Sequence, residues 1–391
     1  MNQIKLQAIT PILRVKGFSC LKDVEITFKR ITLFIGEQGT GKSVTCKLYY
    51  FFTEAIRKVA TICLRDELLA KDFVAKLQNE FRIIFPESAW KHDSFEIEWR
   101  SENVTVRISH KVDNKRLKID FDQFVNLYAK SLEAVKDFKN SKAYREQSRY
   151  GFEADYALDR YVRGVVDKFF PCTSVDYIPA GRSFFSTIQD TVFTLLSNNI
   201  GIDYFLKEFG QRFESFRFHF YRMGRRFADP LLRKILHGTY VYDGKEQWIE
   251  TDAYHKVRLA DASSGQQEAL PLLMMLMSSK APIENRGRCV LIEEPEAHLY
   301  PTAQEMIVDH IGNILRRSNN LRVMITTHSP FILCCINNLL TRNEDMFKDN
   351  VSAYHLNNGE SESIFDEDYC MINASRYDAV SFKISNEVGG D

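Results

Sequence analysis

The glycine-rich segment at residues 36–43 contains the side chains of this chain that are best suited to chemistry. It fits the spacing Gly-x-x-x-x-Gly-Lys-Ser and lies between the apolar run Ile31–Ile35 and a helix-like segment. Glycines let backbone N–H groups turn toward phosphate oxygens, the lysine can contact the β- and γ-phosphates, and the serine hydroxyl can bind Mg²⁺. A glycine-rich turn that binds nothing is the less favoured alternative. We predict a nucleotide site formed by Gly36, Glu37, Gln38, Gly39, Thr40, Gly41, Lys42, Ser43 and Val44.

Two adjacent carboxylates follow a second apolar run. Residues Cys289–Ile292 have the composition of a buried parallel strand, and Glu293 and Glu294 stand where that strand ends. Gathering two carboxylates at one strand end is unfavourable unless a cation offsets their charge, so Mg²⁺ is the expected partner. A solvated acidic loop is the alternative.

Two further segments lie at the ends of predicted elements in the second half of the chain. A strand at residues 323–326 leads to His328, which we expect near the γ-phosphate. An apolar helix from about residue 269 to residue 277 follows a Ser-Gly turn, whose hydroxyl and backbone donors could face an anion. Taken alone, the turn is better explained as an ordinary helix cap; its residues are Ser263, Ser264, Gly265 and Gln266.

Composition limits the class of protein. The 391 residues are 45% apolar and 27% charged, which suits a packed core in one domain with a large insertion or in two to three domains. The 52 basic and 52 acidic side chains balance, which argues against strong attraction of the whole molecule to nucleic acid or membrane. Eight scattered cysteines predict reduced core thiols, and no signal or membrane-spanning segment is evident. We therefore expect a soluble cytoplasmic protein without a membrane partner.

The remaining pattern predicts the surrounding elements. Because strands precede the glycine-rich loop, we expect the site at the edge of a mixed sheet. Helices are predicted from residue 44 to about residue 85 and over much of 121–170, without the sustained heptads of a coiled coil. Strands are expected at residues 12–15, 24–28, 94–99, 104–108, 117–119 and 175–178, with a hairpin at 239–250.

Residues 211–234 interleave seven basic side chains with aromatic ones. Such interleaving can bind single-stranded nucleic acid. An amphipathic helix with core aromatics and solvated arginines is the more common explanation, and we favour it.

The four segments, in this order, resemble the ABC-type ATPase heads of the group that includes SMC-like, RecF-like and OLD-like proteins. The likeness covers residues 10–50 and 260–335. It implies an α/β fold of the P-loop NTPase type, ABC-ATPase head-like, with a mixed central sheet, an antiparallel β-subdomain and a helical insertion. The head would consist of two parts, residues 1–120 and 236–345. A mainly helical insertion, residues 121–235, would separate them, and residues 346–391 would form a tail.

The resemblance also implies roles. ATP and Mg²⁺ would be the cofactors, with Ser43 and Glu293 on the metal and Lys42, Glu294 and His328 catalytic. The signature residues Ser263–Gln266 would contact nucleotide held by another copy of the chain. The family's Asp is Glu293 here, its fuller signature reads Ser-Ser-Gly-Gln-Gln, and residues 179–182 are the candidate for its Q-loop.

Three functions remain open at this stage. The first is an ATPase that controls a separate effector, such as a nuclease or toxin of anti-phage defence. The second is a RecF- or SMC-like repair ATPase that binds nucleic acid, for which residues 211–234 are the only support. The third is an ATP-dependent scaffold with little turnover.

Overall fold

The computed structural model describes residues 10–102, 104–111, 116–147, 152–187, 202–222, 229–278 and 287–373. Within these ranges, no helix is both long enough and apolar enough to cross a membrane.

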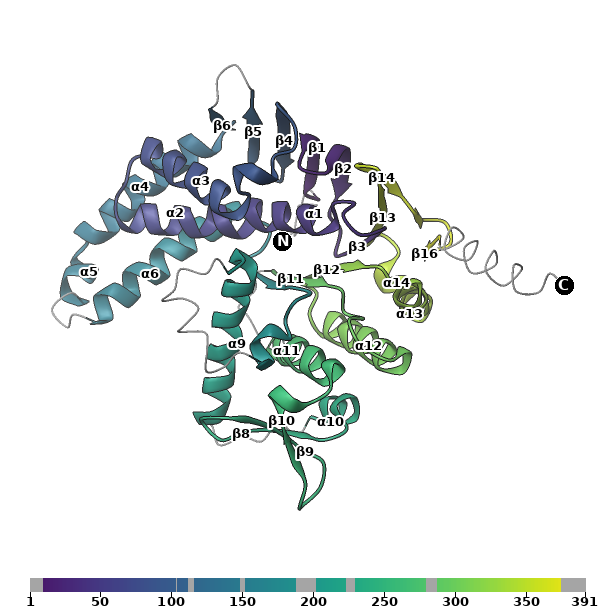
Figure 1. Cartoon of the computed structure of the whole chain (residues 1–391). Helices are drawn as coiled ribbons and strands as arrows, with labels where there is room; N and C mark the ends of the chain where they lie inside the picture. Colours follow the sequence, from purple (N-terminus) through teal and green to yellow (C-terminus); the bar gives the residue numbers. More distant parts are fainter. Residues whose placement is uncertain are drawn as a thin grey trace.

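A single mixed sheet of eleven strands organises the molecule, in the order β6-β5-β4-β1-β2-β14-β13-β3-β12-β11-β7 (Figure 1). The strands β7, β11, β12, β3 and β13 run parallel to one another. Their apolar, largely β-branched runs are buried on both faces, as parallel strands require. These strands span Ser174–Ile178, Arg288–Glu293, Leu321–Thr327, Ile31–Ile35 and Val351–Asn357.

The other half of the sheet is antiparallel. The neighbours β2, β1, β4, β5 and β6 alternate in direction, and β14 joins them to the parallel half by pairing with both β13 and β2. This confirms the expected antiparallel strands, including the third one at residues 117–119. Their bounds are Leu21–Thr27, Ile12–Phe18, Phe95–Arg100, Thr105–His110, Leu117–Phe121 and, for β14, Glu360–Ser363.

Helices cover both faces of the sheet (Figure 1). One layer begins with α1, which continues through a π-helical turn at Phe51–Ala55 into α2, and it also contains α3, α4 and α6. The other layer contains α9, α11, α12 and α13. The bounds are Lys42–Tyr50 (α1), Ile56–Arg65 (α2), Ala70–Ile84 (α3), Phe124–Asn140 (α4), Lys142–Gln147 (α5), Phe152–Val166 (α6), Phe184–Thr187 (α7), Tyr204–Arg222 (α9), Pro230–Leu236 (α10), Ser264–Ser278 (α11), Pro301–Arg317 (α12), Pro330–Thr341 (α13) and Glu344–Phe347 (α14).

Three short strands form a separate small sheet, β10-β9-β8, and two more pair near the end of the described chain. The predicted hairpin is confirmed as β8 and β9, and Asp243 accepts hydrogen bonds from two backbone N–H groups inside its turn. The bounds are Thr239–Tyr242 (β8), Gln247–Glu250 (β9), Lys256–Arg258 (β10), Phe365–Asp366 (β15) and Met371–Ile372 (β16).

Two hydrophobic cores lie on the two faces of the parallel strands. Along β11, Leu291 faces the core that contains α1, whereas its neighbours Val290 and Ile292 face the core that contains α11. The strand alternation thus locks helices from distant parts of the sequence onto one sheet.

The position of the glycine-rich loop differs from the expectation. We expected a site at the edge of the sheet, but β3 lies between β13 and β12 in its interior. The reason is β13, residues 351–357 of the segment assigned to the tail, which pairs with β3 on the side away from β12. Residues 374–391 of that segment lie outside the described part.

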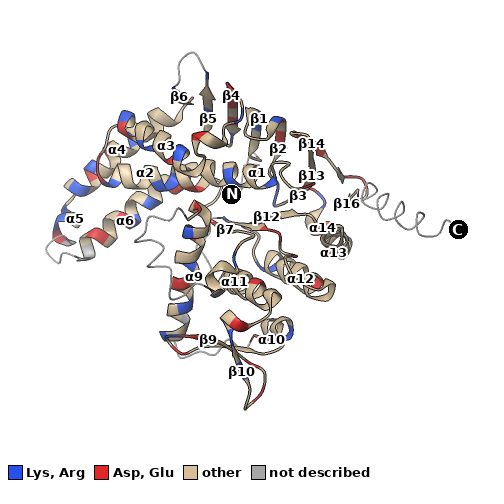
Figure 2. Ribbon diagram, in the orientation of Figure 1, with Lys and Arg blue, Asp and Glu red and all other residues tan. Residues whose placement is uncertain are grey.

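The described part of the basic and aromatic stretch at residues 211–234 is helical, in α9 and α10, but the favoured interpretation of core aromatics and solvated arginines holds only in part, because Phe218 is exposed. Its Phe213 is buried, Arg212 pairs with the buried carboxylates of Asp176 and Glu54, and Arg217 stacks on the ring of Tyr242. Figure 2 shows basic and acidic residues alternating along this helix and across the rest of the molecule. Arg225 and Arg226 lie outside the described residues.

Candidate active site

The predicted site residues converge at the carboxyl ends of three neighbouring strands. Strand β3 leads to the glycine-rich loop, β11 ends at Glu293, and β12 ends just before His328. Because β3, β12 and β11 are adjacent and parallel, their carboxyl ends lie side by side at one end of the strands. This is where ligands bind in open α/β sheets.

The backbone of the loop needs glycine at its two ends. Gly36 has φ 153°, and a Cβ atom there would lie 2.2 Å from the carbonyl oxygen of Leu356 on β13. Gly41 has φ 105°, and a Cβ atom would lie 2.2 Å from the Leu21 side chain. Side chains at these positions would therefore push the loop away from its supporting strands.

Lys42 begins helix α1 and reaches back into the loop. Its Nζ donates hydrogen bonds to the carbonyl oxygens of Gly36 at 2.8 Å and Glu37 at 2.7 Å. Partial burial lowers the pKa of Lys42, and the nearby carboxylate of Glu294 opposes that shift. The ammonium group is thus desolvated and held by neutral acceptors, which a triphosphate, with its negative charge, can replace favourably.

His328 joins Lys42 to the second carboxylate. Its Nδ1 lies 3.4 Å from Lys42 Nζ, and its Nε2 lies 3.1 Å from an oxygen of Glu294. The residues expected to be catalytic are therefore linked through the His328 ring. Glu294 also has φ 44°, an uncommon backbone conformation for a residue other than glycine, and its N–H donates to Thr326. Such strain gathers at functional sites.

Glu293 points toward strand β7. One of its oxygens accepts a 2.6 Å hydrogen bond from the Tyr177 hydroxyl, and the other accepts from the backbone N–H of Ala180 at 3.3 Å. These contacts fix the carboxylate while leaving lone pairs on both oxygens. The Ala180 contact places the candidate Q-loop, residues 179–182, beside the acidic strand end.

The donor set suits magnesium. Ser43 is exposed at the start of α1, and Glu293 supplies a hard carboxylate oxygen. Within the described ranges, no three His, Cys, Asp or Glu side chains gather as a complete metal site. Mg²⁺ commonly takes one or two carboxylates together with substrate phosphates and water, so Ser43 and Glu293 fit it.

Sequence reasoning missed the role of a third carboxylate. Glu296 accepts hydrogen bonds from the Thr327 hydroxyl at 2.7 Å and from the backbone N–H of His328 at 2.8 Å. It therefore holds the end of β12 in the conformation that presents His328. Its spacing of two residues from Glu294 was the available signal.

The signature segment lies apart from the loop. Ser263 and Gln266 form a reciprocal cap at the start of α11, with the Gln266 oxygen accepting from the Ser263 backbone at 3.1 Å. Ser264 is exposed, and a Cβ atom on Gly265 would lie 2.7 Å from the carbonyl oxygen of His298. A cavity of about 680 Å³ beside this segment includes no glycine-rich-loop residue in its lining.

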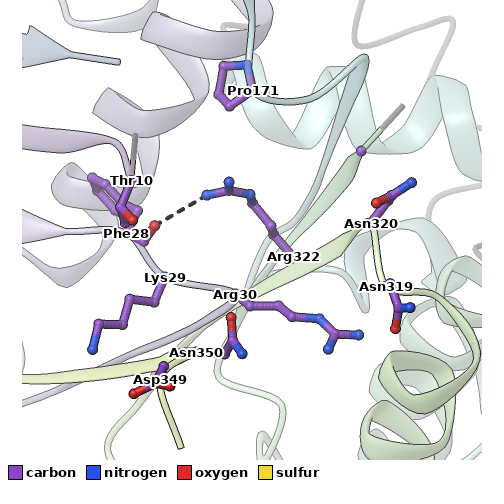
Figure 3. Close-up of a pocket in the computed structure, with 11 residues that line it drawn as sticks. Thr10, Phe28, Lys29, Arg30, Pro171, Asn319, Asn320, Arg322, Asp349 and Asn350 are labelled. Carbon is purple, nitrogen blue, oxygen red and sulfur yellow. Dashed lines mark hydrogen bonds between the residues drawn. The ribbon is translucent and has the colours of Figure 1, made fainter. Parts of the chain in front are cut away.

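A second cavity, of about 360 Å³, lies at the other end of the parallel strands, beside the residues that precede them (Figure 3). Its arginines are engaged in supporting backbone, since Arg322 donates to the Phe28 carbonyl and Arg30 to carbonyls at the end of α12. No predicted site residue lines it.

One family model and two solved structures are similar to this chain. Residues 181–333 match the family model described as an AAA ATPase domain, which includes the signature segment, both strand-end carboxylates and His328. Two solved structures align at 16% identity. One is the SmcHead bound to the C-winged helix domain of ScpA (TM-score 0.42, covering 90% of this chain and 96% of that one). The other is the SMC head domain from Thermotoga maritima (TM-score 0.39, covering 91% and 98%).

Residues 181–333 are therefore similar to an AAA ATPase domain. The family match covers the strand-end carboxylates and His328, and the glycine-rich loop at residues 36–43 lies outside it.

Proposed function

We propose that two copies of this chain enclose Mg²⁺–ATP and that closure and opening of this pair control a separate effector protein. The supporting observation is the division of the site. Lys42 and Glu294 both contact His328. The signature residues Ser263, Gly265 and Gln266 instead line a cavity that no glycine-rich-loop residue lines. The signature segment is then free to meet nucleotide on a second copy.

The hydrolytic roles follow from position and charge. Lys42 exchanges its carbonyl acceptors for the β- and γ-phosphates, and His328 contacts the γ-phosphate. Ser43 and Glu293 would hold Mg²⁺, which would neutralise charge on the phosphates. Glu294 orients and polarises the attacking water, because its carboxylate already lies 3.1 Å from His328, the residue assigned to the γ-phosphate.

Nucleotide binding must rearrange the contacts that now join these side chains. The Lys42–His328 contact at 3.4 Å and the His328–Glu294 contact at 3.1 Å link the three groups to one another. Phosphate would draw Lys42 and His328 to itself and release Glu294 for water. The catalytic carboxylate is thereby freed only when substrate is present.

An effector is favoured over nucleic acid as the target of control. Arg212 and Arg217, in the basic stretch, are used inside the molecule against carboxylates and an aromatic ring. The balanced net charge adds no general attraction to a polyanion. We place a nuclease or toxin of anti-phage defence first among effectors.

Nucleotide-dependent assembly tests this function. The natively expressed Glu294→Gln protein is purified with Mg²⁺–ATP, the assembly is weighed by native mass spectrometry, and any bound protein is assayed for nuclease or toxin activity. We expect a closed oligomer that retains an active partner, and loss of both with Lys42→Ala. A monomer under all conditions would contradict the shared site. A single-turnover ATPase assay of the wild-type protein tests the third function. Hydrolysis confined to one round would favour the ATP-dependent scaffold.

A further inference from the structure

We propose that Arg182 is a positioning residue that couples the signature helix α11 to the backbone of Glu294. The inference rests on the proposed function and adds the route by which one half of the shared site governs the other.

Arg182 joins three separate elements. Its guanidinium donates to the carbonyl oxygens of Glu293 at 2.9 Å and Glu294 at 3.1 Å, at the end of β11. It also donates to Pro179 at 3.2 Å, in its own loop, and to the Glu268 carbonyl at 3.0 Å, in α11. The planar, multidentate guanidinium is suited to such a junction, and a lysine could not reproduce it.

The charge of Arg182 is balanced from the signature helix. Its side chain is fully buried, and the Glu268 carboxylate, also buried, lies 3.2 Å from it. Glu268 additionally accepts from the backbone N–H of Ser183 at 3.3 Å. Separating a buried ion pair leaves an uncompensated charge, so Arg182 and Glu268 must move together.

The backbone of Glu294 needs this support. Its φ of 44° is an unfavourable backbone conformation for a residue with a side chain. Arg182 holds its carbonyl, while Thr326 accepts from its N–H. These contacts on both sides of the residue keep the carboxylate aimed at His328.

Helix α11 provides the connection to the second copy. Ser264 is its first residue, and Glu268 follows one turn later on the same rigid helix. A shift of the helix when Ser264 meets nucleotide is therefore passed to Glu268, then to Arg182, and on to the Glu294 backbone. The carboxylate reaches its working position only when the pair of subunits has closed.

Kinetics of Arg182→Lys test the coupling, with Arg57→Lys as the matched control. Arg57 is also a largely buried arginine paired with carboxylates, Glu54 and Asp167, and within the described part of the chain its side chain has no hydrogen bond to a predicted site residue. We expect Arg182→Lys to keep ATP affinity and to lower kcat by roughly 100-fold, since misplacing a catalytic group by about 1 Å can have that effect. Arg57→Lys should retain wild-type kcat per folded molecule.

A double-variant cycle separates positioning from mere stability. If α11 acts through Arg182, Ser264→Arg reduces kcat in the wild type but adds little further loss to Arg182→Lys. Glu268→Gln, which keeps the side-chain shape, should give the same kcat defect and replaces Arg182→Lys if that protein does not fold.

Two results would overturn the inference. One is unchanged kcat per folded molecule in both Arg182→Lys and Glu268→Gln, with only the melting temperature lowered. The other is a double variant, Ser264→Arg with Arg182→Lys, whose loss of kcat equals the product of the losses in the two single variants. Failure of the proposed function looks different, because then the Glu294→Gln protein would stay a monomer in the presence of Mg²⁺–ATP.

Discussion

The glycine-rich loop and the signature segment are built in opposite ways. In the loop, Lys42 is buried and bonded to the loop carbonyls, and its Nζ also lies 3.4 Å from the side chain of His328. In the signature segment, Ser263 and Gln266 satisfy each other as a helix cap, while Ser264 is left exposed at the surface.

The difference concerns where each half finds its ligands. The loop has every group for binding phosphate within one chain, so its function depends on local geometry. The signature segment presents donors outward from a helix start, and we infer that its ligand arrives on another subunit. Variants in the two halves should therefore have different defects.

The largest expected effect is that of Glu294→Gln. Loss of the carboxylate that polarises water should lower kcat by about 10²–10⁴-fold while ATP stays bound, because the amide keeps the shape. Steady-state phosphate release and nucleotide affinity check this. Glu305→Gln, an exposed carboxylate on α12, is the control. Wild-type turnover in Glu294→Gln would remove its assigned role.

Next in size is Lys42→Ala, which should act on binding. Removing a charged donor to phosphate loses about 1.5–3 kcal/mol, or roughly 10- to 150-fold in affinity. Fluorescent-nucleotide titration measures it. Lys47→Ala, in the same helix but paired with Asp203, should bind ATP normally. Equal affinity of both variants would show that the loop does not hold the triphosphate.

Ser264→Arg tests the signature segment in the same way. We expect it to leave ATP affinity unchanged and to reduce turnover by about tenfold or more, because the second subunit no longer closes on the phosphates. Mixing it with Lys42→Ala should restore hydrolysis, since a mixed pair contains one site with an intact loop and an intact signature segment. No recovery on mixing would place both halves in one subunit.

The smallest effect is expected from charge reversal at Arg222, Arg225 and Arg226. Arg222 stacks near the ring of Phe218 at the end of α9, away from the ATP site. ATP turnover and DNA affinity should both stay at wild-type values in a binding assay over several salt concentrations. A weaker, less salt-dependent affinity for DNA would instead support the nucleic-acid alternative.

Local spacing was sufficient to predict the loop, the acidic strand end and His328. Each is a short motif at the end of an apolar strand, and parallel strands bring such ends together. Spacing could not predict the contribution of Arg182 or Glu296. Their roles depend on hydrogen bonds to backbone atoms of elements distant in the sequence, which no local sequence pattern predicts.

The sequence by itself determined the chemistry, because glycine, lysine and carboxylate types at these positions suit phosphate and magnesium whatever surrounds them. Only the tertiary structure decided where that chemistry lies. Strand β13, distant in the chain, pairs with β3 and moves the loop from the expected edge to the interior of the sheet. Strand pairing between remote segments is set by packing of the whole core, which no local pattern specifies.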